Sequence, residues 1–169
     1  MRTCLLLVGG FGTRISHILG DVPKPLAPVN GAPFLYWLVL LLYKNGVRQI
    51  VLLSFFHADQ IEKFASDLHL PGLIVEVVVE PSAMGTAGSV AYALSQLPDI
   101  DDEFFIMNGD TLVITDLDTL FSEMATKSPF CLFGISVVDC ARYGSLTLTS
   151  GSLLANFNEK VTVGPGVIN

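Results

Sequence analysis

The chain has 169 residues, of which 51% are hydrophobic and 15% charged, and its mean hydropathy is +0.59. Its 9 lysine and arginine residues against 16 acidic residues give a net charge of −7, which argues against nucleic acid or an anionic membrane as a partner. The size and composition predict a single α/β domain over residues 1–169, with a sheet buried under helices on both faces. A phosphorylated ligand would have to be held by local cations and a metal ion.

Cys4, Cys131 and Cys140 are odd in number and lack metal-ligand spacing, which predicts reduced thiols in a cytoplasmic protein. The apolar run before the first glycines is too short for a signal peptide. Phe34–Leu42 is very apolar but far shorter than the roughly 20 residues that cross a bilayer, so we expect no membrane insertion. We predict a buried helix there, which is also a candidate contact surface in a homo-oligomer.

Strand and helix signals alternate along most of the chain. In order, the predicted elements are a strand at Thr3–Val8, a helix at Pro33–Lys44, a strand at Arg48–Ser54, a helix at Ala58–His69, a strand at Leu73–Val79, a helix at Thr86–Leu97, a strand at Glu103–Met107, a helix at Asp116–Thr126 and a strand at Pro129–Val137. This alternation predicts βαβ units and a Rossmann-like, open, mostly parallel sheet. Gly46 and Pro71-Gly72 are typical helix stops.

The last part of the sequence has a different pattern. Leu146–Thr149 and Ser152–Phe157 flank Ser150-Gly151, which predicts a β-hairpin about a tight turn. The sequence then ends on the apolar stretch Gly166–Asn169, as expected of either a short protein or a piece of a longer chain. We see no repeat, low-complexity tract or linker, and therefore predict no domain boundary.

A loop with three glycines follows the first predicted strand. Gly9-Gly10-Phe11-Gly12-Thr13-Arg14 comes directly after the apolar residues 5–8, and Lys24 follows between two prolines. Glycines let backbone N–H groups close on an anion, and arginine and lysine side chains bind phosphate oxygens. The pattern predicts a phosphate-binding loop at the carboxyl end of the first strand.

Other interpretations of this loop fit less well. A dinucleotide-binding loop needs a third glycine where Ile15 stands, and a Walker A loop needs Gly-Lys-Ser/Thr where Gly12-Thr13-Arg14 stands. A glycine-rich turn without a ligand is the remaining alternative. Lys24, in a second loop between prolines, makes that alternative less attractive.

The motifs in combination resemble a known family. Gly9–Arg14, followed by Pro23-Lys24-Pro25-Leu26, resembles the signature of the sugar-1-phosphate nucleotidyltransferases. Gly85-Thr86-Ala87-Gly88 and Asn108-Gly109-Asp110 follow in the order and spacing of that family. The resemblance spans essentially the whole chain and implies a fold of the nucleotide-diphospho-sugar transferase type. Val8 stands where the family usually has alanine.

Motifs in the last thirty residues narrow the resemblance. Arg142-Tyr143-Gly144, Asn158-Glu159-Lys160 and Gly164–Asn169 resemble the branch that makes GDP-heptoses, the D-glycero-D-manno-heptose 1-phosphate guanylyltransferases. Residues 16–20 depart from the family's common Arg-Pro-Leu-Thr pattern.

The resemblance implies a reaction in which a sugar 1-phosphate oxygen attacks the α-phosphorus of a nucleoside triphosphate and releases pyrophosphate. Such chemistry needs positioning and charge neutralisation, and no protein nucleophile. Arg14 would hold the departing pyrophosphate, and Lys24 would lie between the α-phosphate and the incoming phosphate. The implied nucleotide-binding residues are Val8, Gly9, Gly10, Gly12, Thr13, Glu80, Gly85 and Thr86.

Asp110 is the candidate metal ligand. It follows the predicted strand at residues 103–107 in an Asn-Gly-Asp turn, and Mg²⁺ takes one or two carboxylates together with phosphate oxygens. An Asx turn or a helix cap is the alternative role for Asp110. The resemblance implies a second metal-ligating aspartate on a later strand, and this sequence stops before that strand.

Glu80 is the candidate residue for recognition of the base. A carboxylate accepts hydrogen bonds and can bridge the N1–H and N2–H₂ donors of guanine, so we expect GTP as the nucleotide. The alternative is a solvated acidic residue at the end of a strand. For the sugar 1-phosphate, the resemblance implies binding by Asn108, Gly144, Glu159, Lys160 and Asn169, unless Asn158-Glu159-Lys160 only ends a solvent-facing strand.

The predicted function is therefore a Mg²⁺-dependent guanylyltransferase that acts on a heptose 1-phosphate, in a pathway to capsule or lipopolysaccharide precursors. A uridylyl-, thymidylyl- or mannose-1-phosphate transferase is the alternative within this class. A nucleotide-binding subunit without catalysis is the alternative from another class, and a dinucleotide oxidoreductase is a distant third. His17, His57 and His69 have no partners at metal or triad spacing. His57, near a predicted helix start, and His69, near a predicted helix end, are expected to be capping or surface residues.

Overall fold

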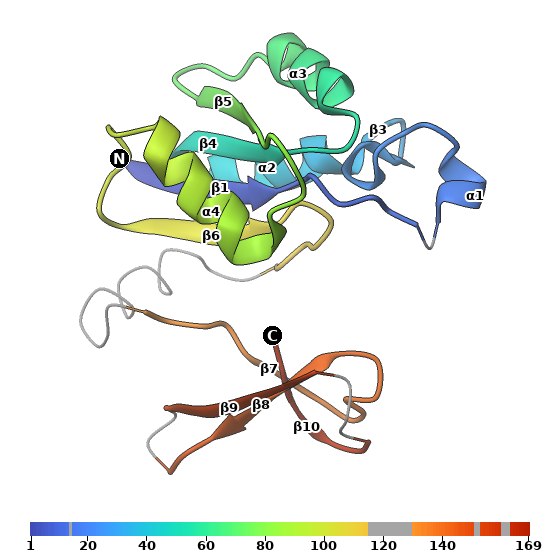
Figure 1. Cartoon of the computed structure of the whole chain (residues 1–169), viewed down its shortest axis with the longest axis vertical. Helices are drawn as coiled ribbons and strands as arrows, with labels where there is room; N and C mark the ends of the chain where they lie inside the picture. Colours follow the sequence, from blue (N-terminus) through green and yellow to red (C-terminus); the bar gives the residue numbers. More distant parts are fainter. Residues whose placement is uncertain (14, 115–129, 151–152, 160–162) are drawn as a thin grey trace. The chain divides into compact units, whose positions relative to one another are not determined.

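The structure is a computed structural model that describes residues 1–13, 15–114, 130–150, 153–159 and 163–169. The chain forms two compact units, Met1–Asp118 and Thr119–Asn169, which we call unit 1 and unit 2 (Figure 1). A single domain over residues 1–169 stays a prediction. Each unit has its own sheet, and the topology of each sheet follows from the order of its strands.

Unit 1 is built on a four-stranded parallel sheet. Its strands are β1 (Arg2–Leu7), β4 (Val47–Ser54), β5 (Ile74–Val79) and β6 (Phe104–Asn108), and they lie in the order β5-β4-β1-β6. Leu5 of β1 pairs with Val51 of β4 on one side and with Ile106 of β6 on the other. The prediction of an open parallel sheet is confirmed, and the predicted strand bounds differ from the observed ones by one residue.

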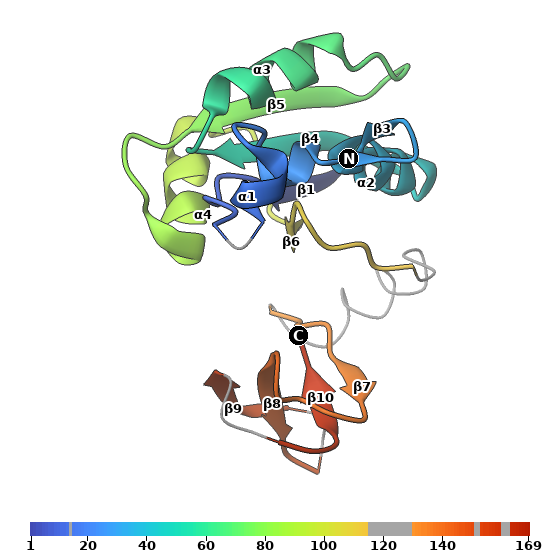
Figure 2. The same cartoon turned by 90° about the vertical axis from the view of Figure 1, so that its right-hand side faces the viewer.

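Helices cover both faces of this sheet, as predicted. The chain runs outward from β1 through α2 (Phe34–Lys44), β4 and α3 (Ala58–Asp67) to β5. It then returns through α4 (Gly85–Gln96) and crosses to β6 at the opposite edge. Because parallel crossovers are right-handed, this reversal places α4 on the face opposite to α2 and α3. Figures 1 and 2 show α4 on one side of the sheet and α2 on the other.

The strands bury side chains on both faces, which explains their continuous apolar sequences. On the α4 face, Leu5, Val51, Leu53 and Val78 pack with Ala93 of α4. On the α2 face the helix presents an apolar stripe with helical spacing, and all four of its residues are buried: Leu35, Leu38, Val39 and Leu42. The stripe explains why this helix is so apolar, and a homo-oligomer stays a prediction.

Four short elements between β1 and α2 were not predicted: α1 (Ser16–Leu19), a 3₁₀ turn η1 (Lys24–Leu26), β2 (Pro28–Val29) and β3 (Ala32–Pro33). The turn between β2 and β3 has positive φ angles at Asn30 (+49°) and Gly31 (+82°). An Asn-Gly pair favours this kind of hairpin turn, so the signal was present in the sequence. Trp37 of α2 donates from Nε1 to the carbonyl of Val29 at 2.8 Å and ties the hairpin to the helix.

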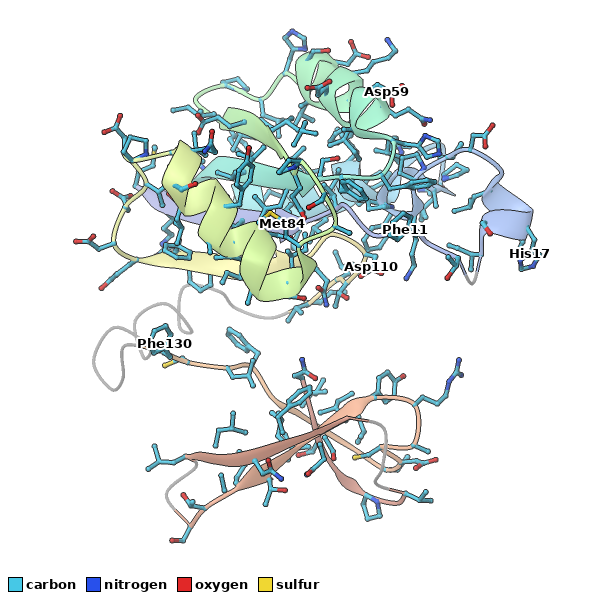
Figure 3. The ribbon with its side chains drawn as sticks, viewed as in Figure 1. Phe11, His17, Asp59, Met84, Asp110 and Phe130 are labelled. Carbon is cyan, nitrogen blue, oxygen red and sulfur yellow. The ribbon has the colours of Figure 1, made fainter. Side chains whose placement is uncertain are left out.

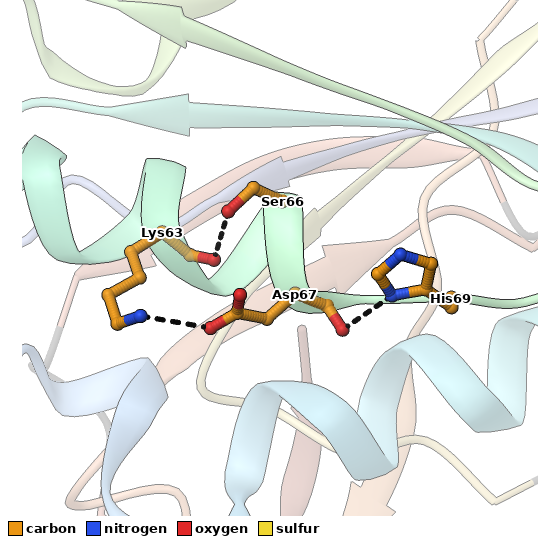
Figure 4. Close-up of polar contacts among 4 residues, drawn as sticks. All are labelled: Lys63, Ser66, Asp67 and His69. Carbon is orange, nitrogen blue, oxygen red and sulfur yellow. Dashed lines mark hydrogen bonds and ion pairs between the residues drawn. The ribbon is translucent and has the colours of Figure 1, made fainter.

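The helix α3 ends two residues before its predicted end. Its last residue is Asp67, because Leu68 takes an extended conformation with ψ of 117°. His69 approaches the Asp67 carbonyl through Nδ1 at 2.9 Å, and Lys63 pairs with the Asp67 carboxylate at 3.2 Å (Figure 4). The prediction that His69 lies at a helix end is confirmed.

Unit 2 is a small antiparallel sheet. Its strands are β7 (Ile135–Val137), β8 (Gly144–Leu148), β9 (Leu154–Glu159) and β10 (Gly166–Ile168), in the order β7-β10-β8-β9. The predicted hairpin is formed by β8 and β9, in which Leu146 pairs with Phe157. The predicted strand at 129–137 is wrong for residues 130–134, because its pairing partner β10 is only three residues long. The predicted helix at Asp116–Thr126 lies outside the described residues.

Two further predictions concern cysteines and membranes. Cys4, Cys131 and Cys140 are free thiols, and burial raises the pKa of the Cys4 thiol to about 12. Because the thiolate is the nucleophilic form, we interpret Cys4 as a core residue and not as a nucleophile. Of the helices in the described ranges, none has the length and hydrophobicity needed to cross a bilayer.

Candidate functional site

The topology of unit 1 selects one place for a ligand. From β1 the chain moves first to β4 on one side and only later to β6 on the other side. The strand order therefore reverses between β1 and β6, which are neighbours in the sheet. In open α/β sheets, ligands bind at such a reversal of the strand order. The glycine loop follows β1, and the Asn108-Gly109-Asp110 turn includes the end of β6.

A pocket of about 470 Å³, which we call the larger pocket, opens at this point. It is lined by Leu7, Val8, Gly10, Gly12, Thr13, Ile15, Lys24, Pro25, Asn108 and Asp110. Seven of the site residues that the sequence analysis predicted thus lie around one cavity, although they come from three separate stretches of the chain. All three stretches lie around the carboxyl end of β1.

The glycine loop presents unused donors to this pocket. Within the described part of the chain, the main-chain N–H groups of residues 9–13 donate to no protein acceptor. Val8, directly before them, still completes the sheet by donating to the carbonyl of Leu53 at 2.9 Å. A run of free N–H groups at a strand end is a binding surface for an anion such as phosphate. The free N–H groups are what such a loop requires, and phosphate binding by this loop stays a prediction.

Lys24 and Asp110 meet across the larger pocket. Lys24 begins η1 between Pro23 and Pro25, which are both buried, so its backbone is held firmly. Its Nζ lies 2.5 Å from Oδ2 of Asp110. The Lys24 and Asp110 side chains are 42% and 35% exposed. Their ion pair can therefore be replaced by contacts with a ligand or a metal ion at little cost in free energy. The arrangement supplies one cation and one carboxylate at the larger pocket.

The larger pocket offers one carboxylate, that of Asp110, which suits Mg²⁺ better than a metal ion that needs all its ligands from the protein. In the described parts of the chain there is no group of three or more histidine, cysteine or acidic residues that could hold a metal ion. Mg²⁺ needs only one or two carboxylates when phosphate oxygens and waters complete its shell. Asp110 satisfies this requirement beside the free N–H groups of the loop.

A second pocket, of about 250 Å³, is also lined by the glycine loop; we call it the smaller pocket. Leu7 and Gly10 line both pockets. The other lining residues of the smaller pocket are Gly9, Phe11, Leu53, Phe55, Glu80, Ala83, Met84, Gly85, Thr86 and Ser89. The predicted base-recognition residues Glu80, Gly85 and Thr86 are thus brought together with the glycine loop, and Figure 3 shows Phe11 and Met84 near this end of unit 1.

Glu80 is 7% exposed, so the alternative of a solvated acidic residue is wrong. Its Oε1 accepts a hydrogen bond from the Ser89 hydroxyl at 2.7 Å, and its Oε2 accepts one from the Met84 N–H at 3.1 Å. An ionised carboxylate has about four acceptor positions, which leaves acceptor capacity facing the smaller pocket. The sequence analysis missed Ser89, because its contact with Glu80 depends on where α4 packs.

In unit 2, three of the predicted sugar-phosphate residues lie close together. Gly144 pairs with Glu159 across the β8–β9 hairpin. Asn169 follows β10 on the other side of β8, and its Oδ1 lies within 3.3 Å of the position that a Cβ on Gly144 would occupy. The sheet of unit 2 therefore gathers Gly144, Glu159 and Asn169 at one end, although they are far apart in the sequence.

Two predicted residues, Arg14 and Lys160, lie outside the described residues. The remaining histidines line neither pocket: His17 is exposed on α1 (Figure 3), and the His57 ring meets Phe56 edge-on, with 3.9 Å between centroids and 60° between planes. His57 does not cap α3 with its side chain, contrary to one of its expected roles.

Gly10 is expected to matter for ligand binding and not for folding. Among the described glycines, it alone combines an ordinary φ with open space where a Cβ would go. Gly10→Ala should therefore keep the thermal midpoint of the wild type but weaken binding of a nucleoside triphosphate by about tenfold or more, because the methyl group blocks close approach of a phosphate. Isothermal titration and thermal unfolding would measure the two effects separately.

The matched comparison is Gly109→Ala, in which the added Cβ would lie 2.5 Å from Cγ1 of Val8 and 3.0 Å from the Leu7 carbonyl oxygen. This variant should lose about 1–3 kcal/mol of unfolding free energy. Equal nucleotide affinity in Gly10→Ala and wild type would contradict phosphate binding by this loop.

Comparison with known proteins agrees with this geometry. The profile of a protein family described as "Nucleotidyl transferase" matches residues 3–162. A D-glycero-alpha-D-manno-heptose 1-phosphate guanylyltransferase from Campylobacter jejuni is 32% identical over 98% of the chain and 72% of the relative. The enzyme of the same name from Aneurinibacillus thermoaerophilus is 30% identical over 98% of the chain and 70% of the relative.

A solved structure gives the same result for the fold. The crystal structure of HddC from Yersinia pseudotuberculosis, complexed with GMP-PN, superposes with a TM-score of 0.86 at 32% identity. The superposition covers 100% of this chain and 74% of HddC.

Proposed function

Since this chain belongs to the nucleotidyl transferase family, as a sugar-1-phosphate nucleotidyltransferase, we propose that it joins GTP to a manno-heptose 1-phosphate and releases pyrophosphate. The observation that carries the proposal is the pair of pockets that the glycine loop lines, with Leu7 and Gly10 common to both. A nucleoside triphosphate needs a polar site for its phosphates directly beside an apolar site for its base. In unit 1, the larger pocket has the free N–H groups, Lys24 and Asp110, and the smaller pocket, which shares Leu7 and Gly10 with it, has a mostly apolar lining.

In the proposed reaction, the N–H groups of residues 9–13 hold the triphosphate, and Lys24 lies beside the α-phosphate. An oxygen of the sugar 1-phosphate attacks the α-phosphorus, the bond to the β-phosphate breaks, and pyrophosphate leaves with Arg14 as its predicted partner. The protein contributes orientation and positive charge, which is what phosphoryl transfer requires. Asp110 would hold Mg²⁺, and the ion when bound would neutralise charge on the phosphate oxygens.

The preference for guanine rests on the smaller pocket and on the relatives. Glu80 offers acceptor positions to adjacent N–H donors, which guanine has and uracil and thymine lack. The two relatives named above carry guanylyltransferase names, and HddC was crystallised with a ligand whose name begins with GMP. Both lines of support concern the base, and they are independent of each other.

Glu80→Gln is expected to lower the preference for GTP over UTP and dTTP by about tenfold, because an amide replaces one acceptor with a donor. The ratio of kcat/KM values for the three nucleotides would measure this preference. Ser89→Ala is the control that removes a hydrogen bond to Glu80 but leaves the carboxylate in place. An unchanged nucleotide ratio in Glu80→Gln would show that backbone groups read the base instead.

The sugar is proposed from unit 2 and from the relatives. Gly144, Glu159 and Asn169 lie at one end of the sheet of unit 2, where ring hydroxyls would meet them, and Lys160 follows in sequence as the predicted partner of the sugar phosphate. Both curated relatives act on a D-glycero-alpha-D-manno-heptose 1-phosphate by name. A cytoplasmic role in making capsule or lipopolysaccharide precursors would follow from this substrate.

The decisive experiment crosses a panel of nucleoside triphosphates with a panel of sugar 1-phosphates in the presence of Mg²⁺ and measures pyrophosphate. GTP with a manno-heptose 1-phosphate should give the highest rate. A higher rate with UTP, with dTTP or with mannose 1-phosphate would replace the proposed substrates with those. GTP binding without pyrophosphate release in any combination would favour a nucleotide-binding subunit without catalysis.

A further inference from the structure

Phe11 stands at the one position of the glycine loop between Gly10 and Gly12, and its ring is half exposed, at 51%. The ring contacts two aromatic side chains that follow β4. It meets Phe55 edge-on, with 5.8 Å between centroids and 85° between planes, and it meets Phe56 at 5.3 Å and 51°. Aromatic pairs at such distances and angles attract each other, so Phe11 has a defined position.

The aromatic partners of Phe11 are themselves held in place. Gly9 lies so close to β4 that a Cβ on it would come within 2.9 Å of the Phe55 nitrogen. Phe56 meets the ring of His57 edge-on, and His57, in a left-handed backbone conformation (φ +50°), directly precedes α3. The turn from β4 into α3 therefore forms a support on which the glycine loop rests through Gly9 and Phe11.

The smaller pocket has an apolar part and a polar part. Phe11, Phe55 and Met84 contribute apolar surface to it. Glu80 and Ser89 contribute the polar groups, in the hydrogen-bonded arrangement described above. A nucleobase requires both kinds of surface, because its flat faces are apolar and its edge carries the hydrogen-bonding groups.

We propose that Phe11 contacts the nucleobase: its ring, braced by Phe55 and Phe56, covers one face of the base in the smaller pocket. The inference rests on the proposed function, because it requires that a nucleoside triphosphate is the ligand. It goes further in assigning to one short loop two separate tasks, in which the glycine N–H groups hold the phosphates and Phe11 holds the base. Stacking is insensitive to the groups on the edge of the base, so Phe11 supplies affinity while Glu80 supplies the choice of base.

This division of tasks can be tested with three probes: GTP, ATP and inorganic triphosphate, each titrated in the presence of Mg²⁺. Phe11→Ala should weaken the binding of GTP and ATP by about ten- to a hundred-fold and leave the GTP-to-ATP ratio unchanged. The affinity for inorganic triphosphate, which has no base, should stay within about twofold of wild type. Phe11→Tyr should restore nucleotide binding.

Ile74→Ala is the matched control, because Ile74 has a similar exposure (48%) and lines neither pocket. It should bind all three probes as the wild type does. Equal weakening of GTP and inorganic triphosphate in Phe11→Ala would overturn the proposal, since the ring would then only shape the phosphate loop. Unchanged GTP affinity would overturn it as well. If the wild type bound GTP no better than inorganic triphosphate, the proposed function itself would fail.

Discussion

Replacing Lys24 with alanine is expected to lower kcat by about 10²–10³-fold, the usual loss when a donor aimed at the transition state is removed. The fold should survive, because the Lys24 side chain is 42% exposed and its ion pair with Asp110 contributes at most about 1 kcal/mol. Pyrophosphate release at saturating substrates and a thermal unfolding curve would measure the two quantities.

Lys63→Ala is a matched control for this variant. Lys63 also forms an ion pair with an aspartate, at 3.2 Å from Asp67 (Figure 4). It lies on α3 and lines neither pocket. Both substitutions remove one lysine and one exposed ion pair and change the net charge equally. Lys24→Ala with activity within a few-fold of wild type, or an equal loss in Lys63→Ala, would remove Lys24 from the reaction.

Asp110→Asn is expected to lower kcat by about 100-fold or more and to shift the Mg²⁺ concentration for half-maximal rate upward. The reason is that an amide oxygen is a much weaker ligand for Mg²⁺ than a carboxylate, and charge neutralisation by the ion contributes several kcal/mol in such reactions. A titration of rate against Mg²⁺ at fixed GTP would measure both effects. Asp67→Asn is the control, because Asp67 is the carboxylate of the Lys63 pair.

The contact between Lys24 and Asp110 leaves a second role for Asp110, that of orienting Lys24. The double variant Lys24→Ala/Asp110→Asn separates the two roles, since residues that act through one another show non-additive losses. We expect the double variant to be slower than Lys24→Ala alone and to need more Mg²⁺. A double variant equal to Lys24→Ala in rate and in Mg²⁺ dependence would show that Asp110 only positions the lysine.

The sequence predicted the architecture of unit 1 well because its elements follow local rules. The strands in its core are continuous apolar runs, and α2 carries Leu35, Leu38, Val39 and Leu42 at helical spacing. Periodicity and turn residues are properties of neighbouring residues, so they can be read without knowledge of the fold. The strand prediction was wrong for residues 130–134 because an apolar run forms a strand only where another strand pairs with it. A pattern of neighbouring residues does not record that pairing.

By itself, the sequence determined that a loop with three glycines and a cation between two prolines follow the first strand, which predicts phosphate binding there. Only the tertiary structure decided that Asp110 meets Lys24 over one pocket, and that Phe11 and Glu80 line a second pocket behind the same loop. The reversal of strand order between β1 and β6 produces the first arrangement, and the packing of α4 and of the turn after β4 produces the second. Contacts of this kind join residues tens of positions apart, so no local pattern records them.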